Sequence, residues 1–472
     1  MTQKHVDSTD PVILWFRNDL RLHDHPGVMS ALDSGRPIIP VYIYDQTLYA
    51  RPLGAASKWW LHRSLKALAE DLQAHSSRLI LFEGDSADVI VGLIEKTNAK
   101  TVICAHSFDL ICEKNDDALE KSLSDRHVDL ERHNATLLAP PGVVKTRTGT
   151  PFRVFTPFRR ALADGGFFES HAPHRLPPGK WRAPESWPKA AALDTLNLDD
   201  TRTRSGKNWA TGFDRFTPGE AGARAALDHF IEHHLADYET GRDRTDKDAT
   251  SHLSAHLRFG EISPQRVLYE IAEAVADNRR LSEPAAKFRS ELAWREFCYG
   301  LLYQQPKLDH VNFRKGFEDF PWRDDDKGFK AWCRGETGYE LVDAGMRELW
   351  HTGYMHNRVR MVCASFLIKH LMIDWRRGEQ WFWDCLVDAD PANNPGNWQW
   401  VAGCGADASP FFRVFNPLTQ ADKFDPAGIY RKRHLGGYKG EPIVEHAFAR
   451  QRVLDAYRTS RVDRKDEDAD AD

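Results

Sequence analysis

The sequence predicts two domains of different class: an N-terminal α/β domain with a doubly wound parallel sheet, followed by an all-α domain. Four short apolar runs, at 12–16, 38–43, 79–82 and 101–105, are rich in β-branched or aromatic residues. They alternate with helical patterns, and this alternation is typical of a parallel sheet covered by helices. After about residue 210 the apolar residues recur at helical spacing, with no further run of strands.

The helix expected between the second and third strands runs from Ser57 to His75, and Ser57 is expected to cap it. Parallel sheets bind ligands beyond the carboxyl ends of their strands. The loop Arg17–His25 follows the first strand and would lie at such an end. The apolar face of the helix consists of Trp60, Leu61, Leu65, Leu68 and Leu72.

A proline-rich connector separates the two domains. Nine prolines fall between 139 and 189, with little periodicity around them. We expect an α/β domain at 1–138, a linker at 139–210, a helical domain at 211–462 and an acidic tail at 463–472. The helices expected in the second domain are 221–234, 264–277, 285–303, 339–351, 357–373 and 380–387.

The charge balance argues against a generally basic nucleic-acid binder, because the formal net charge is −5. The last seven residues, DEDADAD, hold five acids and no base. The rest of the chain is therefore neutral, and a local basic face remains open.

The seven cysteines form no CxxC pair, which predicts reduced thiols without a disulfide framework or a metal site. The N-terminus has no apolar signal region, and no apolar run is long enough to cross a membrane. These features predict a cytoplasmic protein without a membrane span.

Three polar segments could carry chemistry. Asp388–Pro417 places acids, asparagines and two tryptophans between prolines and glycines that break any long helix; it is either an irregular surface loop or a wrap around a polar, aromatic ligand. Thr337–Met361 ends in a basic helix whose arginines could bind phosphate or merely face solvent. Thr250–Pro264 offers three hydroxyls ahead of a helix, as an N-cap cluster or as phosphate donors.

Taken together, the motifs resemble those of the DNA photolyase/cryptochrome family. The chain carries ILWFRNDLRLHDHP near its start, WREF at 294–297, TGYELVDAGMREL at 337–349, and then MHNRVRM and DADPANNPGNWQW. The similarity runs from about residue 11 to 460, with the motifs in the family's order.

The resemblance implies that the helical domain binds FAD. It assigns the phosphates and ribityl chain to Tyr238, Thr250, Ser251, Leu253, Ser254 and Arg295. It assigns the surroundings of the flavin ring to Asn357, Arg360, Asp388, Asp390 and Asn394. An amide at Asn394 adds no negative charge beside a flavin anion, whereas a carboxylate there would repel the anion or protonate the ring.

The resemblance further implies a class I lyase that repairs cyclobutane pyrimidine dimers in DNA with light. The dimer would be flipped out of the duplex against the indoles of Trp294 and Trp400. A cryptochrome-like blue-light photoreceptor is the alternative. The other DNA-binding residues implied are Arg242, Glu291, Asn357, Arg358, Met361, Arg413 and Lys423.

Two further features follow from the resemblance. Trp398, Trp375 and Trp322 match the family's chain of electron-donating indoles, and with Glu291 and Asn394 they complete the implied catalytic set. The family is usually monomeric.

The chain also departs from the family in two places. The Trp-rich stretch expected after FDPAGIY is missing, which leaves the loop geometry on the DNA side open. Phe108 and Asp109 stand where the antenna motif usually has other residues, so a second chromophore could be a folate, a deazaflavin or a flavin.

Overall fold

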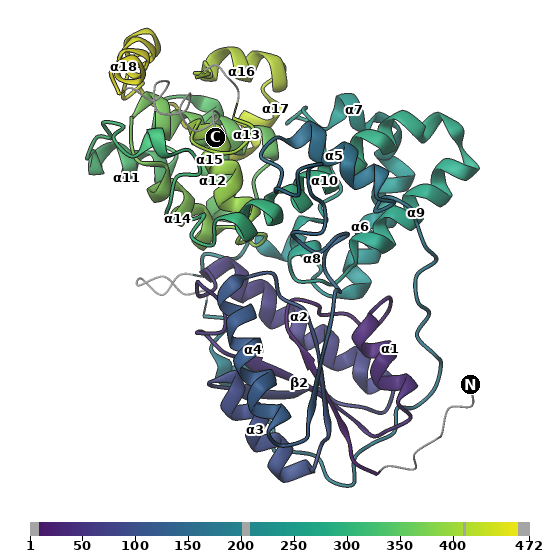
Figure 1. Cartoon of the computed structure of the whole chain (residues 1–472). Helices are drawn as coiled ribbons and strands as arrows, with labels where there is room; N and C mark the ends of the chain where they lie inside the picture. The colour runs from purple at the N-terminus through teal and green to yellow at the C-terminus, as the bar shows by residue number, and fades with distance from the viewer. Residues whose placement is uncertain (1–8, 201–207, 409–411, 461–472) are drawn as a thin grey trace.

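The structure is a computed structural model of the chain, and it describes residues 9–200, 208–408 and 412–460. Figure 1 shows the α/β domain, in purple and blue, packed beneath a larger helical domain. The predicted acidic tail at 463–472 lies outside the described residues.

The α/β domain is built on a five-stranded parallel sheet in the order β3-β2-β1-β4-β5. Its central strand β1 is fully buried, as a strand covered by helices on both faces should be. The strands are β1 Val12–Phe16, β2 Ile38–Tyr44, β3 Ile80–Glu83, β4 Thr101–Ala105 and β5 Asp129–His133, and the helices are α1 Pro26–Asp33, α2 Ala55–Ala74, α3 Ser86–Thr97 and α4 Leu110–Ser124.

Two local predictions differ from this structure. The edge strand β5 reads DLERH and was not predicted, because it contains no apolar run. The predicted cap at Ser57 is wrong: α2 begins two residues earlier, with Gly54 as its N-cap. The Ser57 side chain is buried and donates instead to the carbonyl of Leu386 in the helical domain, at 3.3 Å.

The connector between the domains is not entirely irregular. It contains α5 (Phe155–Asp164), whose buried residues Phe155, Phe158 and Leu162 pack toward the helical domain. This short helix was not predicted, because prolines are frequent in the rest of the connector.

The second domain is helical throughout its described part, as predicted. Its helices are α6 Glu220–His233, α7 Tyr238–Gly241, α8 Ser254–Arg258, α9 Pro264–Asp277, α10 Ser282–Gln304, α11 Asp326–Arg334, α12 Glu340–Thr352, α13 Asn357–Ser365, α14 Trp375–Cys385, α15 Asn393–Ala402, α16 Pro417–Phe424, α17 Ile429–Leu435 and α18 His446–Thr459. Short 3-10 turns lie at Leu193–Leu196, Phe213–Arg215, Leu235–Asp237, Arg279–Leu281 and Lys315–Phe317, and α13 continues into a π-helical turn, Phe366–His370.

The segment expected to contain no long helix holds α15. Pro395 is its third residue, in the first turn, where a missing N–H breaks no intrahelical hydrogen bond. The helix ends at Gly403, which has a φ of +96°.

The two domains are joined by buried contacts. The Trp60 indole of α2 donates to Glu261 Oε1 at 2.9 Å, and the carbonyl of Phe259 accepts from Leu20 N at 3.0 Å. Gly260, with a φ of +65°, lets the backbones meet, because a Cβ there would lie 2.2 Å from the carbonyl oxygen of Asn18. The loop after β1 is thereby fixed against the helical domain.

Candidate functional site

An ion pair between a half-buried arginine and a buried aspartate lies at the centre of the candidate site. The guanidinium of Arg360, on α13, donates to both carboxylate oxygens of Asp388, at 3.1 and 2.9 Å. Its Nε donates to the carbonyl of Met355 at 2.7 Å. The bidentate geometry fixes the plane of the guanidinium and brings together two residues that the sequence predicted to share a site.

The hydroxyl cluster before α8 approaches this ion pair through Tyr354. The Thr250 hydroxyl lies 3.5 Å from the Tyr354 hydroxyl, and the Arg360 guanidinium lies 5.3 Å from the Tyr354 ring. Burial raises the pKa of Tyr354, so the phenol stays neutral and can donate. Ser251 accepts from Leu253 N, and Ser254 is exposed at the start of α8.

The amide of Asn394 is held by a buried carboxylate. Asn394 Nδ2 donates to Glu379 Oε1 at 2.7 Å, and the same oxygen accepts from Arg51 Nη1, also at 2.7 Å. Burial raises the pKa of Glu379, while Arg51 and Asn394 oppose that rise. Because the amide donates through nitrogen to Glu379, its oxygen remains to accept from a ligand.

Asp390 has a structural role that its neighbour Asp388 lacks. Its Oδ1 accepts from the backbone of Ala392 and from both nitrogens of Asn393, at 2.7 to 2.9 Å. Its Oδ2 accepts from the Tyr299 hydroxyl at 2.9 Å. This carboxylate therefore holds the turn that begins α15.

Charged residues predicted to contact DNA form ion pairs, either with one another or with neighbouring residues. Glu291 on α10 accepts from Arg242 and forms an ion pair with Lys287, at 3.3 Å. Arg358 donates to Asp243 at 2.7 Å and to the sulfur of Met361 at 3.7 Å. These contacts orient both arginines, and a DNA phosphate would compete with a carboxylate for each.

The two indoles predicted to form a wall have different surroundings. Trp294, on α10, stacks on Phe155 of α5 with ring centroids 3.7 Å apart and planes 7° apart. Trp400, on α15, is half-buried beside the large core of the helical domain. One face of Trp294 is therefore covered by a residue from the connector.

The three predicted electron-donating indoles share one hydrophobic cluster, with Trp398 and Trp375 buried and Trp322 half-buried. The Trp398 ring lies 4.9 Å from the Phe382 ring and 6.1 Å from the Trp332 ring, measured between centroids. Trp332 is fully buried, and no motif in the sequence singled it out.

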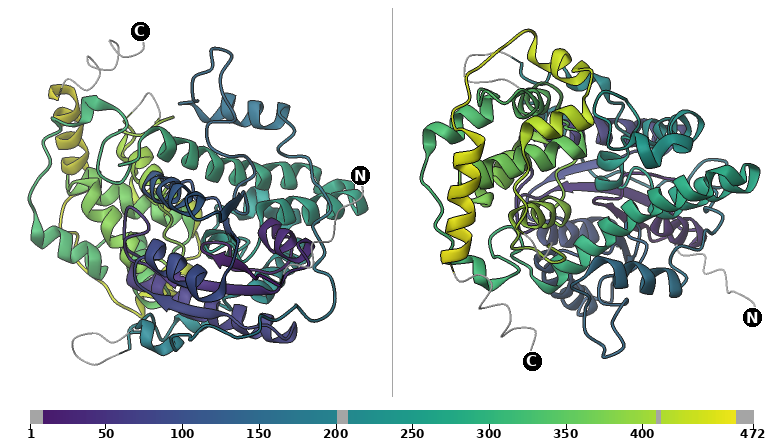
Figure 2. Two further views of the ribbon diagram at one scale, coloured as in Figure 1. Left: turned by 60° about the horizontal axis from the view of Figure 1, so that its bottom comes forward. Right: turned by 90° about the horizontal axis from the view of Figure 1, so that it is seen from above.

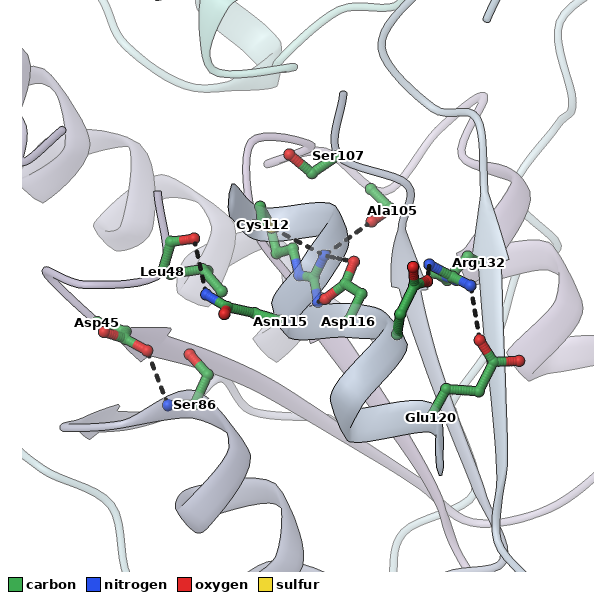
Figure 3. A network of polar contacts seen from close by, with 12 residues as sticks. Asp45, Leu48, Ser86, Ala105, Ser107, Cys112, Asn115, Asp116, Glu120 and Arg132 are labelled. Carbon is green, nitrogen blue, oxygen red and sulfur yellow. Dashed lines mark hydrogen bonds and ion pairs between the residues drawn. The ribbon is translucent and has the colours of Figure 1, made fainter. Parts of the chain in front are cut away.

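A cavity lies between the domains, at the carboxyl ends of β1 and β4. Aromatic residues from both domains line it, among them Tyr49, Phe108 and Trp383, with Arg51 and Arg258. Arg17 also lines it, and its guanidinium donates to both oxygens of Asp116, at 2.8 and 2.6 Å. Figure 3 shows Asp116 on α4, with Cys112 and Ala105 on the same network of contacts.

The remaining predicted residues are spread around these groups. Arg295 lines the interdomain cavity and donates to the carbonyls of Thr136 and Leu257, at 2.8 and 3.3 Å. Tyr238 is buried against Phe230 and Phe288. Asn357, Arg413 and Lys423 are exposed, and Leu253 is buried.

In the described ranges, no group of three or more His, Cys, Asp or Glu side chains could hold a metal ion. No helix within those ranges is both long and apolar enough to span a bilayer. The seven cysteines are all free thiols.

Residues 12–178 match the family model "DNA photolyase", and residues 288–440 match "FAD binding domain of DNA photolyase". A deoxyribodipyrimidine photo-lyase from Agrobacterium fabrum is 47% identical, over 95% of this chain and 98% of that protein. Cryptochrome-2 from Arabidopsis thaliana is 34% identical, over 90% of this chain and 70% of that protein.

The crystal structure of a bacterial class III photolyase from Agrobacterium tumefaciens has a TM-score of 0.90 and 46% identity, covering 96% of this chain and 98% of that one. The two matched models, the shared fold and the identity over nearly the whole length agree. The chain is a flavoprotein of the DNA photolyase and cryptochrome family, with an α/β domain and a helical FAD-binding domain.

Proposed function

We propose that this enzyme repairs cyclobutane pyrimidine dimers in DNA with light, using reduced FAD. The observation that carries the proposal is the polar site of the FAD-binding domain, where hydrogen bonds fix the orientation of Arg360, Asp388 and Asn394. Membership of the photolyase family supports DNA repair, and the dimer type is our inference.

The residues present fit FAD. The Thr250 and Ser251 hydroxyls precede a helix and suit phosphate oxygens, and Arg295 is a third candidate for that role. Arg360 and Asp388 supply a donor and an acceptor for the edge of a flavin ring. Glu379 Oε2 is buried and has no hydrogen-bond partner among the described residues, which suits a site that a ligand completes.

Bound, reduced FAD would supply light-driven one-electron chemistry for opening the cyclobutane ring. The protein's own residues bind and orient the lesion and keep water away. Glu291 and Asn357 would form hydrogen bonds with the flipped bases. Met361, Trp294 and Trp400 would pack against them.

The arginines that pair with Glu291 and Asp243 would hold the DNA backbone. Arg242 and Arg358 are already oriented by Glu291 and Asp243. Arg413 and Lys423 are exposed and free to meet phosphates further out. A duplex substrate and a monomeric enzyme belong to the same proposal.

The 46% identity to the structure of a class III photolyase supports class III as a second candidate subclass, beside the class I that the motifs suggested. Trp398, Trp375 and Trp322 would carry electrons from the surface to the flavin during its photoreduction. Trp332 is a further candidate, because its ring contacts Trp398.

We also propose that the interdomain cavity binds the second, light-harvesting chromophore. Its aromatic lining and its arginines suit a planar, anionic ring system such as a folate, a deazaflavin or a flavin. The parent protein is reconstituted with each compound in turn. The compound that binds should add one new absorption band to the spectrum. Blocking the cavity with Ala50→Trp should abolish that band and leave the FAD spectrum unchanged.

Repair of an oligonucleotide with one thymine dimer tests the proposed function. Purified, reduced protein is illuminated with blue light against a dark control, and restored thymines are measured by chromatography. Light-dependent restoration supports the proposal. FAD binding without repair would overturn it and favour a cryptochrome-like photoreceptor, which the similarity to cryptochrome-2 makes the second candidate.

A further inference from the structure

The connector carries a basic hairpin whose residues are not part of the candidate site. Between Gly142 and Ala163 the sequence has no carboxylate, although the whole chain has a net charge of −5. A local concentration of one charge is the footprint expected of a surface that binds a polyanion. The five cations of this segment are Lys145, Arg147, Arg153, Arg159 and Arg160.

The hairpin has a defined structure. Thr146 N donates to the carbonyl of Thr150 at 2.9 Å, and Gly149 N donates to the carbonyl of Thr146 at 3.0 Å. The hydroxyls of Thr146, Thr148 and Thr150 lie 2.7 to 3.2 Å from one another. In both views of Figure 2 the blue loop before α5 projects from the body of the molecule.

The hairpin is anchored to α10, which carries Trp294, and to the loop that follows α15, the helix of Trp400. Gln304, at the end of α10, donates to the carbonyl of Phe152 at 3.1 Å. Phe155 stacks on Trp294 of the same helix. Asp407 N, in the loop after the helix of Trp400, donates to the carbonyl of Arg153 at 3.1 Å.

The cations of the hairpin (142–153) and of the first turns of α5 are available for a ligand. Within the described residues, no ion pair joins Lys145, Arg147, Arg159 or Arg160 to a carboxylate. Arg242 differs in this respect, since it is paired with Glu291. Unpaired cations bind phosphate without first breaking an ion pair.

We propose that the hairpin at 142–153 and the first turns of α5 bind the phosphate backbone of DNA that flanks the lesion. This inference rests on the proposed function, because the DNA that carries the lesion is then the polyanion that lies beside Trp294. Lys and Arg supply the charge, and the exposed threonine hydroxyls supply neutral donors. Phe155 acts as a positioning residue, since it links this basic surface to Trp294.

The test measures DNA affinity in the dark as a function of salt, for Lys145→Gln/Arg147→Gln and Arg159→Gln/Arg160→Gln. The probe is a fluorescent duplex oligonucleotide with one thymine dimer. Removing one cation that neutralises a phosphate should reduce the slope of log K against log salt by about 0.9, so each double variant should reduce it by about 1 to 2. Single-turnover repair at saturating DNA should stay at the parent rate.

The matched control is Lys96→Gln/Lys100→Gln, which removes the same charge from exposed positions on the α/β domain and should keep the parent slope. Hairpin variants with the parent slope would overturn the inference and leave the proposed function intact. A parent protein that neither binds nor repairs the damaged duplex would overturn both.

Discussion

At the scale of single residues, the contact of Asn394 with Glu379 decides which charges surround the predicted flavin position. The amide is neutral and donates to a buried carboxylate, which Arg51 holds from the other domain. The motif match identified Asn394 in the sequence. It could not identify Arg51 or Glu379, because Arg51 lies 328 residues from Glu379 and only the fold brings them together.

Asn394→Asp should therefore lower the fraction of fully reduced flavin that illumination produces. The new carboxyl would lie beside Glu379, and two adjacent carboxyls cannot both ionise freely, so one would hold a proton near the ring. Absorption spectra under anaerobic illumination measure the effect. Asn397→Asp, at an exposed position on the same helix, is the control and should behave like the parent. Parent-like spectra for Asn394→Asp would contradict the argument.

At the scale of elements, α14 and α15 approach so closely that only glycine fits at the contact. A Cβ on Gly378 would lie 2.3 Å from the Trp398 ring and 2.5 Å from Leu367. Sequence periodicity predicted a helix here but placed its start five residues late, at 380 rather than Trp375. The sequence could not predict the close contact, because a glycine inside a helical pattern indicates only a less stable helix and not what packs against it.

Gly378→Ala should destabilise the protein by about 1 to 3 kcal/mol, as overpacking in a core does. It should also slow flavin photoreduction, because the Trp398 indole must move. Gly300→Ala is the matched control: no atom lies within 4 Å of its Cβ position, so alanine should stabilise α10 by about 1 kcal/mol. Thermal unfolding and photoreduction rates of both variants test the pair. Equal stability of the two variants would contradict the packing argument.

At the scale of the whole molecule, the two domains are held together by hydrogen bonds between residues that lie far apart in the sequence. Periodicity predicted both domain classes and four of the five strands, because buried strands and amphipathic helices leave strong patterns. It could not predict the interface. Glu220, at the start of α6, looks like an ordinary first-turn acid, yet it accepts from Leu22 N and His23 N of the α/β domain, at 2.8 and 3.2 Å.

The Glu220 carboxylate makes the interface between the two domains sensitive to low pH. Burial alone would raise the pKa of Glu220, but His23, Arg224 and the backbone of Leu22 lower it to about 2. A pKa lowered on folding contributes stability above the unfolded value of about 4.3, and this contribution is lost as the pH falls toward 2. The displacement corresponds to about 3 kcal/mol at pH 7.

Glu220→Gln should accordingly lower the free energy of unfolding by about 3 kcal/mol at pH 7, and this difference from the parent should shrink as the pH falls below about 4.3. Urea unfolding at pH 7, 5.5, 4 and 3 measures it. Glu232→Gln, at an exposed position on the same helix, removes an equal charge and should change stability little at any of these values. A Glu220→Gln deficit that stays constant down to pH 3 would show that the variant loses shape complementarity rather than the ionised carboxylate, and the acid sensitivity of the interface would then need another group.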